Sequence, residues 1–335
     1  MFEKPFHSRP LNTLTILVTG GAGFIGSNIV EYLLKFNTGR VKVLDNLSNG
    51  FYKNIEPFIS HPSLEFIEGD IRNSEDCREA CRDCDFVLHQ AALGSVPRSI
   101  KDPVTTNSVN IGGFLNMLVA ARDNKVKRFV YAASSSTYGD SKQLPKVEGT
   151  IGKPLSPYAL TKYVNELYAE IFEKTYGLEC IGLRYFNVFG PRQDPKGAYA
   201  AVIPLFIDAV LENRPPSING DGEQTRDFTF VENVVEANIK AALSLGFKSE
   251  EKVYNVAYGE KTSLNQLLEV LKTKVGVDFD PVHKPERAGD VRDSLADISK
   301  ARQDFEYNPG IDIREGLEIT LEWFRKNKTF ITRRD

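Results

Sequence analysis

Two residues that lie four positions apart, Tyr158 and Lys162, have the side chains that proton transfer at a substrate hydroxyl requires. Residues at this spacing share one face of a helix, so the Lys162 ammonium can lie beside the Tyr158 phenol. A positive charge there favours phenolate and lowers the phenol pKa from its usual value of about 10. Such a phenol beside a nicotinamide could move a hydroxyl proton together with a hydride. The same spacing also occurs on helices where the tyrosine merely packs and the lysine is solvated. The residues around the pair therefore decide whether it is interpreted as catalytic or structural.

Three serines, Ser134, Ser135 and Ser136, directly follow an apolar segment at 128–133 that we expect to be a strand. Hydroxyl groups at the carboxyl end of a parallel strand face the ligand site of an open α/β sheet. A serine-rich turn is the alternative interpretation. Because the Tyr158 pair follows in the next predicted helix, we predict that Ser134 shares the proton of a substrate hydroxyl.

A glycine-rich loop near the start of the chain predicts a dinucleotide site. Gly20 and Gly23 lie between an apolar segment, 14–19, and a predicted helix, 24–36, and Gly26 lies in the first turn of that helix. Glycine permits the tight turn and lets backbone N–H groups approach a diphosphate at the helix N-terminus. Asp45 ends the next predicted strand, where a carboxylate can bind ribose hydroxyls and repels a 2′-phosphate, so NAD is favoured over NADP.

Apolar segments that alternate with helical patterns predict the fold. Strands are expected at 14–19, 41–45, 64–68, 86–89, 128–133 and 180–185, with long helices at 104–124 and 157–176. Near-continuous apolar strands separated by helices indicate a parallel sheet covered on both faces. We therefore predict an α/β fold with a doubly wound, Rossmann-like sheet.

Beyond residue 188 prolines separate shorter elements, which suits a smaller lobe over the carboxyl edge of the sheet. Its helices are expected near 201–211, 232–245, 263–274 and 313–327. The predicted division is a dinucleotide-binding domain, 1–188, and a smaller C-terminal lobe, 189–335, with one later strand free to return to the main sheet.

Composition narrows the function classes. The 335 residues are 41% hydrophobic and 26% charged, with a net charge of −3, which gives no support for nucleic-acid binding. No apolar segment is long enough to span a membrane, and the N-terminus lacks a secretory pattern, so a cytoplasmic location is expected.

Three cysteines, Cys77, Cys81 and Cys84, have the spacing of ligands to an iron–sulfur cluster. Asp83 stands where such motifs usually have an aromatic residue. The segment also has the pattern of a surface helix with Ser74 as its N-cap. We therefore predict reduced structural thiols and no metal site.

Over essentially its whole length the chain resembles the extended short-chain dehydrogenase/reductase family. Within that family it is most similar to nucleotide-sugar 4-epimerases, especially those that act on UDP-N-acetylglucosamine and UDP-N-acetylgalactosamine. The resemblance rests on Tyr158 with Lys162 and on segments 19–27, 89–92, 93–99, 184–190 and 222–228.

The resemblance implies roles for individual residues. Ser134 takes the place of the catalytic serine or threonine, Tyr158 that of the acid/base and Lys162 that of its partner. Asn187 would contact the sugar or diphosphate, Arg226 and Arg287 the UDP phosphates, and Asp290 the uridine ribose. The implied reaction removes hydride from the sugar C4, turns the flat 4-keto sugar and returns hydride to its other face.

Together, motifs and resemblance predict two sets of binding residues. The cofactor set is Gly20, Gly23, Phe24, Ile25, Gly26, Asp45, Asn46, Asp70, Ile71, Gln90, Ala91, Ala92, Tyr158, Lys162, Tyr185 and Val188. The substrate set is Gly94, Ser95, Ser134, Ser135, Ser136, Asn187, Ala201, Val202, Asn219, Arg226, Arg287, Asp290 and Ser294.

Residues that differ between this chain and related enzymes of other activities favour simple epimerisation. Related dehydratases have Asp-Glu where this chain has Ser135 and Ser136, and neither serine can expel a 6-hydroxyl. Ser294 is small where epimerases limited to non-acetylated sugars have an aromatic residue, and Gly94 and Ala201 are small as well. The pocket is therefore expected to have room for a 2-acetamido group. UDP-glucose and UDP-galactose remain possible further substrates.

Two alternatives stay open. One is a UDP-glucuronate 4-epimerase or another nucleotide-sugar enzyme. A basic residue at the sugar C6 position would support it, and Arg98 is the nearby candidate. The other is a non-catalytic, NAD-responsive binding module.

A homodimer through a four-helix bundle is a further expectation from the resemblance. The predicted helices 104–124 and 157–176 would pair, with apolar faces offered by Leu115, Met117, Leu118, Leu167 and Ile171.

Overall fold

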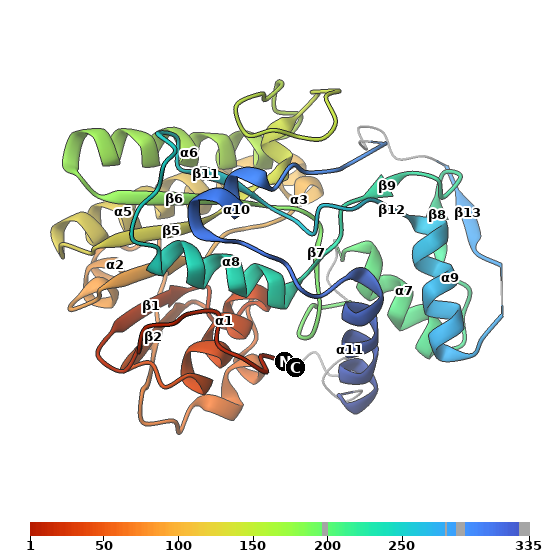
Figure 1. Cartoon of the computed structure of the whole chain (residues 1–335), viewed down its shortest axis with the longest axis horizontal. Helices are drawn as coiled ribbons and strands as arrows, with labels where there is room; N and C mark the ends of the chain where they lie inside the picture. The colour runs from red at the N-terminus through yellow and green to blue at the C-terminus, as the bar shows by residue number, and fades with distance from the viewer. Residues whose placement is uncertain (196–199, 279, 286–291, 328–335) are drawn as a thin grey trace.

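A seven-stranded parallel sheet forms the larger part of the molecule (Figure 1). The computed structural model describes residues 1–195, 200–278, 280–285 and 292–327. The strands run in the order β11-β6-β5-β4-β1-β2-β3, and every neighbouring pair is parallel. Their bounds are β1 Thr15–Thr19, β2 Arg40–Asp45, β3 Leu64–Glu68, β4 Phe86–His89, β5 Arg128–Ser134, β6 Glu179–Tyr185 and β11 Val253–Val256. The predicted doubly wound α/β fold is confirmed.

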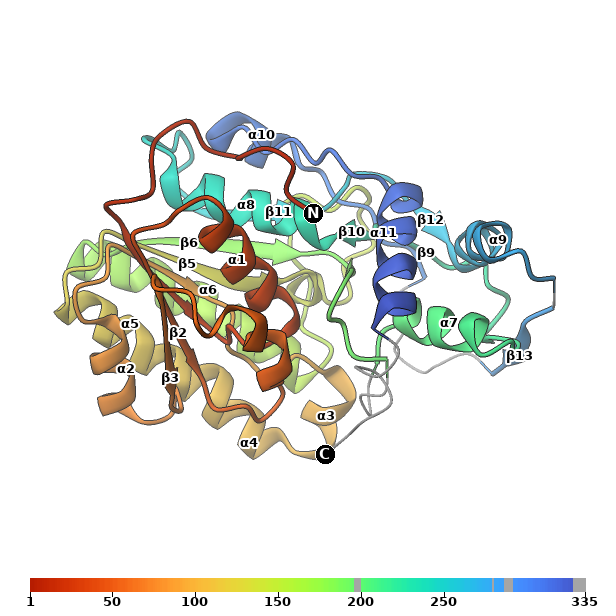
Figure 2. The same ribbon diagram turned by 90° about the horizontal axis from the view of Figure 1, so that it is seen from below.

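Helices cover both faces of this sheet (Figures 1 and 2). Side chains alternate along each strand, so Ile16 and Val18 pack with helices α1 and α8, and Leu17 packs with α2, α5 and α6. The bounds are α1 Phe24–Lys35, α8 Val231–Leu243, α2 Ser74–Cys81, α5 Phe114–Asp123 and α6 Pro157–Tyr176. Burial on both faces explains why the strands have continuous apolar sequences.

The predicted helix at 104–124 is confirmed, because the chain is helical without a break from Pro103 to Asp123, with a wider turn inside the helix. The chain forms α3 Val96–Lys101, α4 Pro103–Asn107, a wider π-helical turn at Ser108–Gly113, and then α5. Gly113 packs against Ile71, which lies in the connection after β3 and whose Cδ1 would lie 2.6 Å from an added Cβ. This close approach brings the wide turn against the connection after β3.

The N-terminus of α2 also differs from the prediction. Asn73, not Ser74, is the N-cap, because its side-chain oxygen accepts from the Glu75 amide at 3.0 Å. Either residue type suits a cap, so sequence alone could not choose between neighbours.

A smaller lobe lies at one end of the sheet (Figure 2). Helices α7 Val202–Leu211, α9 Leu264–Val275 and α11 Ile313–Lys326 enclose an apolar cluster that includes Phe206, Leu267 and Leu321. Three two-stranded pairs complete it: β7 Val188–Phe189 with β10 Thr229–Phe230, β8 Ser217–Asn219 with β13 Val282–Lys284, and β9 Thr225–Arg226 with β12 Thr262–Ser263. The chain returns to the main sheet through α8 and β11, and α10 Ser299–Phe305 packs against β11. No helix within the described ranges is long and apolar enough to cross a membrane.

Candidate active site

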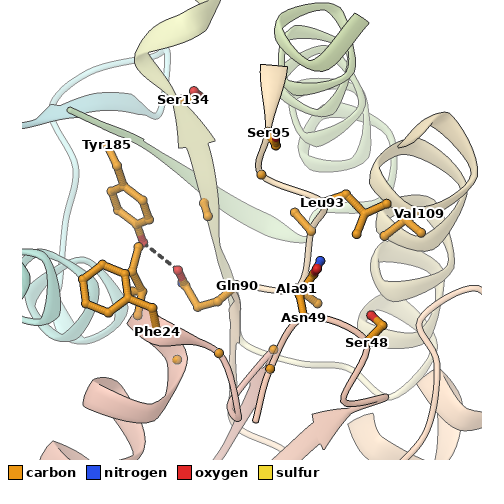
Figure 3. Close-up of a pocket in the computed structure, with 18 of the residues that line it drawn as sticks. Phe24, Ser48, Asn49, Gln90, Ala91, Leu93, Ser95, Val109, Ser134 and Tyr185 are labelled. Atoms are coloured by element: carbon orange, nitrogen blue, oxygen red, sulfur yellow. Dashed lines mark hydrogen bonds between the residues drawn. The ribbon is translucent and has the colours of Figure 1, made fainter. Parts of the chain in front are cut away.

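The carboxyl edge of the sheet opens into a crevice beside β1. Strand β1 lies between β2 and β4, so the connections after β1 and β4 leave in opposite directions. A cavity of about 610 Å³ occupies this place. Figure 3 shows residues from several elements around it, among them Phe24, Gln90, Ser134 and Tyr185.

Every residue of the predicted cofactor set lines this cavity. Members of the predicted substrate set that also line it are Gly94, Ser95, Ser134, Ser135, Asn187 and Ala201. The tertiary structure therefore brings together side chains that are up to 181 residues apart, from Gly20 to Ala201.

The glycine loop is a tight cradle for which side chains would be too large. Gly20 has a φ of +67°, and an added Cβ would lie 2.7 Å from the Ala91 nitrogen. A Cβ on Gly26 would lie 2.1 Å from the Gly20 oxygen. Gly23 precedes α1 and contributes no side-chain cap, and the first residues of the helix, Phe24, Ile25 and Gly26, line the cavity with amides that have no partner within the helix. This geometry fits a bound diphosphate.

Two carboxylates lie at the β2 and β3 end of the cavity. Asp45 accepts from the Ala22 amide at 2.9 Å and from the Leu47 amide at 2.8 Å, and burial raises its pKa. Asp70 accepts from Arg72 and Asn46, and mainly the Arg72 bonds lower its pKa to about 2. Asp45 is thus placed for ribose hydroxyls, and the donor set fits the adenosine half of NAD.

The catalytic pair lies at the opposite end, on the first turns of α6. Ser156 caps this helix, accepting from the Ala159 amide at 3.1 Å, and Tyr158 and Lys162 project towards β5. The Lys162 ammonium donates to the Ala132 carbonyl oxygen at 2.7 Å, and burial lowers its pKa to about 8. Burial raises the pKa of the Tyr158 phenol, while a hydrogen bond with Ser134 lowers it. The prediction that Lys162 sets a low phenol pKa is therefore wrong for the protein alone, because burial dominates.

The Ser134 hydroxyl has a defined direction. Ser134 ends β5, one residue later than predicted, and residues Ser135–Tyr138 turn away as a short 3-10 helix. Its oxygen accepts from the Ser136 amide at 3.2 Å and from the Ser136 hydroxyl at 2.8 Å. Both contacts use acceptor sites of Ser134, so its own proton is available to the Tyr158 phenol, whose pKa a hydrogen bond with Ser134 lowers. Ser136, predicted to bind substrate, instead lies behind Ser134, outside the lining of the two described cavities.

A second cavity of about 460 Å³ adjoins the first and extends into the smaller lobe. Both are lined by Asn187, Val188, Ala200 and Ala201, so they are continuous at that point. From the predicted substrate set it contains Asn187, Ala201, Val202, Asn219 and Arg226. Arg287 and Asp290 lie outside the described residues. Ser294 pairs with Thr225 through its amide, at 3.2 Å, and does not line either described cavity.

Several lining residues were missed by sequence reasoning. Arg214 and Lys284 add positive charge to the second cavity, and Asn49 lines the first beside Arg98. No local motif marks Lys284, because its place depends on the pairing of β13 with β8.

A triangle of polar side chains supports the cofactor end of β4, and Figure 3 shows one of its hydrogen bonds, between Tyr185 and Gln90. Tyr185 Oη donates to Gln90 Oε1 at 3.0 Å, Gln90 Nε2 donates to Asn238 Oδ1 at 3.0 Å, and Asn238 Nδ2 donates to Tyr185 Oη at 2.8 Å. Asn238 belongs to α8, far along the chain from Gln90, and no local sequence motif predicts that it hydrogen-bonds to Gln90 and Tyr185.

The cysteines do not form a metal site. Cys77, Cys81 and Cys84 are buried free thiols, and burial raises the pKa of each; for Cys77 and Cys84 it reaches about 12. Across the described ranges no cluster of three or more histidine, cysteine or acidic side chains could hold a metal ion.

Comparisons with known proteins agree with this geometry. Residues 16–257 match the model of the NAD dependent epimerase/dehydratase family. A putative UDP-glucose 4-epimerase of Methanocaldococcus jannaschii is 41% identical over 314 residues, which cover 93% of this chain and 99% of that protein.

Two solved structures show the same architecture. The UDP-N-acetylglucosamine 4-epimerase of Methanobrevibacter ruminantium M1, in complex with UDP-N-acetylmuramic acid, has a TM-score of 0.88 and 41% identity, covering 93% of this chain and 98% of the other. The UDP-glucuronic acid 4-epimerase of Bacillus cereus, with UDP-glucuronic acid and NAD, has a TM-score of 0.85 and 31% identity, covering 93% and 99%.

Proposed function

Because the chain belongs to the NAD dependent epimerase/dehydratase family, we propose that it interconverts UDP-N-acetylglucosamine and UDP-N-acetylgalactosamine by 4-epimerisation. Its cofactor is NAD, which supplies a reversible hydride acceptor when bound. UDP-glucose and UDP-galactose are further substrates in this proposal.

The observation that carries the proposal is that Ser134 and Tyr158 line the first cavity together, with a hydrogen bond between their hydroxyls that lowers the phenol pKa. The pair can hold and move the proton of a sugar 4-hydroxyl as C4 becomes a carbonyl. The positive Lys162 and the charge of the oxidised nicotinamide both favour the ionised phenol when substrate binds.

Turning of the flat 4-keto sugar requires that the nucleotide stay fixed while the sugar moves. Arg226 and Lys284 give the second cavity positive groups suited to a diphosphate, while Arg214 is paired with Asp208 and Glu212. Two small residues that line the first cavity, Gly94 and Ala201, leave room on the sugar side. A Cβ added to Gly94 would meet no atom within 4 Å, which supports acceptance of a 2-acetamido group.

The glucuronate alternative requires a cation for the C6 carboxylate on the sugar side. Arg98 was the candidate for that role, but its guanidinium donates to Asn49 at 2.8 Å, in the loop after β2. That loop packs on the glycine loop, where the Phe51 amide donates to the Ala22 oxygen at 3.0 Å, so this contact holds Arg98 away from a sugar carboxylate and favours an uncharged sugar. The presence of Ser134, Tyr158 and Lys162 in one cavity favours an enzyme over a binding module.

The test is to incubate the purified protein separately with UDP-N-acetylglucosamine, UDP-glucose and UDP-glucuronate, without added NAD, and to separate the products by chromatography. We expect UDP-N-acetylgalactosamine to form. Turnover of UDP-glucuronate alone would exclude the proposed substrate. Unchanged activity in Tyr158→Phe would exclude the proposed acid/base.

The protein is also proposed to be a homodimer through α6 and the α3–α4 segment. Leu160, Leu167 and Ile171 are 51%, 44% and 55% exposed on α6, and Ile100 and Val104 are 65% and 78% exposed nearby. This apolar face would be covered by the same face of a second copy.

Two residues predicted for that interface are excluded from it. Met117 and Leu118 are fully buried within the chain's own core. A molar mass by light scattering of one chain at all concentrations would exclude the dimer. The four free cysteines suit a reducing compartment, and a cytoplasmic location is part of the same proposal.

A further inference from the structure

One hydrogen bond joins the two walls of the first cavity. Arg98 Nη1 donates to Asn49 Oδ1 at 2.8 Å. Asn49 lies in the loop after β2, and Arg98 lies in α3, after β4. Because β1 lies between β2 and β4 in the sheet, this bond spans the connection that leaves β1, which is the glycine loop.

The Asn49 side of this bond is anchored on the glycine loop itself. The Phe51 amide donates to the Ala22 oxygen at 3.0 Å, and Asn54 Nδ2 donates to the same oxygen at 2.8 Å. Gly50 packs so closely on Ala22 that an added Cβ would lie 2.9 Å from its carbonyl carbon. Asn49 therefore has a fixed place above the turn that would hold a diphosphate.

The Arg98 side is anchored on the catalytic helix. Ser95 caps α3 by accepting from the Arg98 amide at 3.2 Å. The next residue of α3, the buried Ser99, accepts from the Tyr158 amide through its hydroxyl at 3.0 Å. The Arg98 backbone is thus fixed relative to the catalytic helix, and its guanidinium reaches the loop that packs on the glycine turn. Figure 3 shows Asn49 and Ser95 on the walls of the same cavity.

The position of Arg98 in the cavity indicates which group of a bound ligand it contacts. The cavity has Asp45 and Asp70 at one end and Tyr158 and Lys162 at the other. A dinucleotide that reaches both ends must place its diphosphate between them, where the Arg98 fork can bind a dianion. We propose that Arg98 and Asn49 form a clasp across the diphosphate of bound NAD, and that opening this clasp limits release of the cofactor.

The clasp explains how a cofactor could remain bound through many turnovers. An epimerase needs no exchange of NAD, since the cofactor is regenerated within each cycle. A bond that closes behind the diphosphate slows dissociation without contact to the sugar. The proposal rests on NAD binding alone and not on which UDP-sugar is the substrate.

The experiment measures the rate at which NAD leaves the holoenzyme. Arg98→Gln, Asn49→Ala and the double variant are loaded with NAD and desalted, and the NAD that remains on the protein is quantified over time. We expect each single variant to release NAD about tenfold faster, the value of one charge-assisted hydrogen bond. The double variant should be little faster than Arg98→Gln, because both substitutions break the same bond.

Lys101→Gln is the matched control, since it removes a positive charge from the same helix. It should retain NAD as the natural protein does. The clasp is refuted if Arg98→Gln keeps NAD as long as the natural protein does, or if Lys101→Gln releases NAD as fast as Arg98→Gln. It is also refuted if the increase in the release rate of the double variant equals the product of the two single increases. A raised KM for the UDP-sugar with unchanged NAD release would place Arg98 at the sugar and also refute it.

Discussion

The hydroxyl of Ser136 donates a hydrogen bond to the hydroxyl of Ser134, with 2.8 Å between the two oxygens. This bond occupies an acceptor site of Ser134 and leaves its proton available to Tyr158, whose pKa a hydrogen bond with Ser134 lowers. Ser136→Ala should therefore lower kcat about tenfold with little change in KM, because the proton of Ser134 loses its direction. The rising limb of the pH–rate profile should move to higher pH, since Ser134 lowers the phenol pKa. Ser136→Thr keeps the hydroxyl and should restore both; a failure to restore them would contradict this role.

Replacing Gly20 should abolish NAD binding. In Gly20→Ala the added Cβ would lie 2.7 Å from the Ala91 nitrogen, and the backbone has a φ of +67°. The loop must then shift, so the protein should purify without NAD and bind it at least tenfold more weakly by titration calorimetry. Gly112→Ala is the control, because its Cβ would meet no atom within 4 Å. Normal NAD affinity in Gly20→Ala would show that this loop is not the diphosphate site.

Lys162 should make stability depend on pH in the alkaline range. Burial lowers its pKa from 10.5 to about 8, so between these values the unfolded chain binds more protons than the folded one. The free energy of unfolding should rise with pH there, by at most about 1.4 kcal/mol per unit from this group. Urea unfolding of NAD-free protein across that range measures the slope. Lys162→Met should lose the slope and the activity; an unchanged slope would contradict the assignment.

The buried Asp227 carboxyl should make the free energy of unfolding fall as pH rises near neutrality, which is opposite to the effect of Lys162. Its carboxylate is fully buried and accepts from the Tyr258, Gly259 and Ala296 amides, yet burial raises its pKa to about 7. Between pH 3.8 and about 7 the folded protein binds more protons than the unfolded chain. This contribution to stability is complete at the acid end and is lost as pH rises through about 7.

Asp227→Asn removes that titration. The free energy of unfolding of the natural protein should fall relative to the variant by up to about 1.4 kcal/mol per pH unit across this range. The exposed Asp221, paired with Arg292, provides the control substitution Asp221→Asn, which should keep the slope. Parallel pH curves for the natural protein and Asp227→Asn would contradict the prediction.

Gly94 should control which sugar fits. Space beside its backbone would accept a Cβ without contact, so Gly94→Ala should be active on both sugars. Gly94→Leu should fill the sugar side and lower kcat/KM for UDP-N-acetylglucosamine at least tenfold more than for UDP-glucose. Equal losses for both substrates, measured by product chromatography, would show that the acetamido group lies elsewhere.

The features that the sequence determined by itself are local ones. The spacing of Tyr158 and Lys162 places both on one face of α6, and the glycines of 20–26 fit only a strand-to-helix turn. Continuous apolar segments predicted the parallel sheet, because burial on both faces leaves no polar alternation. Each signal lies within one element, where helix and strand geometry relate residue number directly to position.

Only the tertiary structure decided how distant segments meet. The bond of Arg98 with Asn49, the contact of Asn238 with Gln90 and the entry of Lys284 into the second cavity depend on which strands are neighbours. The raised pKa of Tyr158 likewise follows from burial, which exceeds the local effects that spacing predicts. Sequence supplied the groups for proton transfer; desolvation and long-range packing decided their charge and their partners.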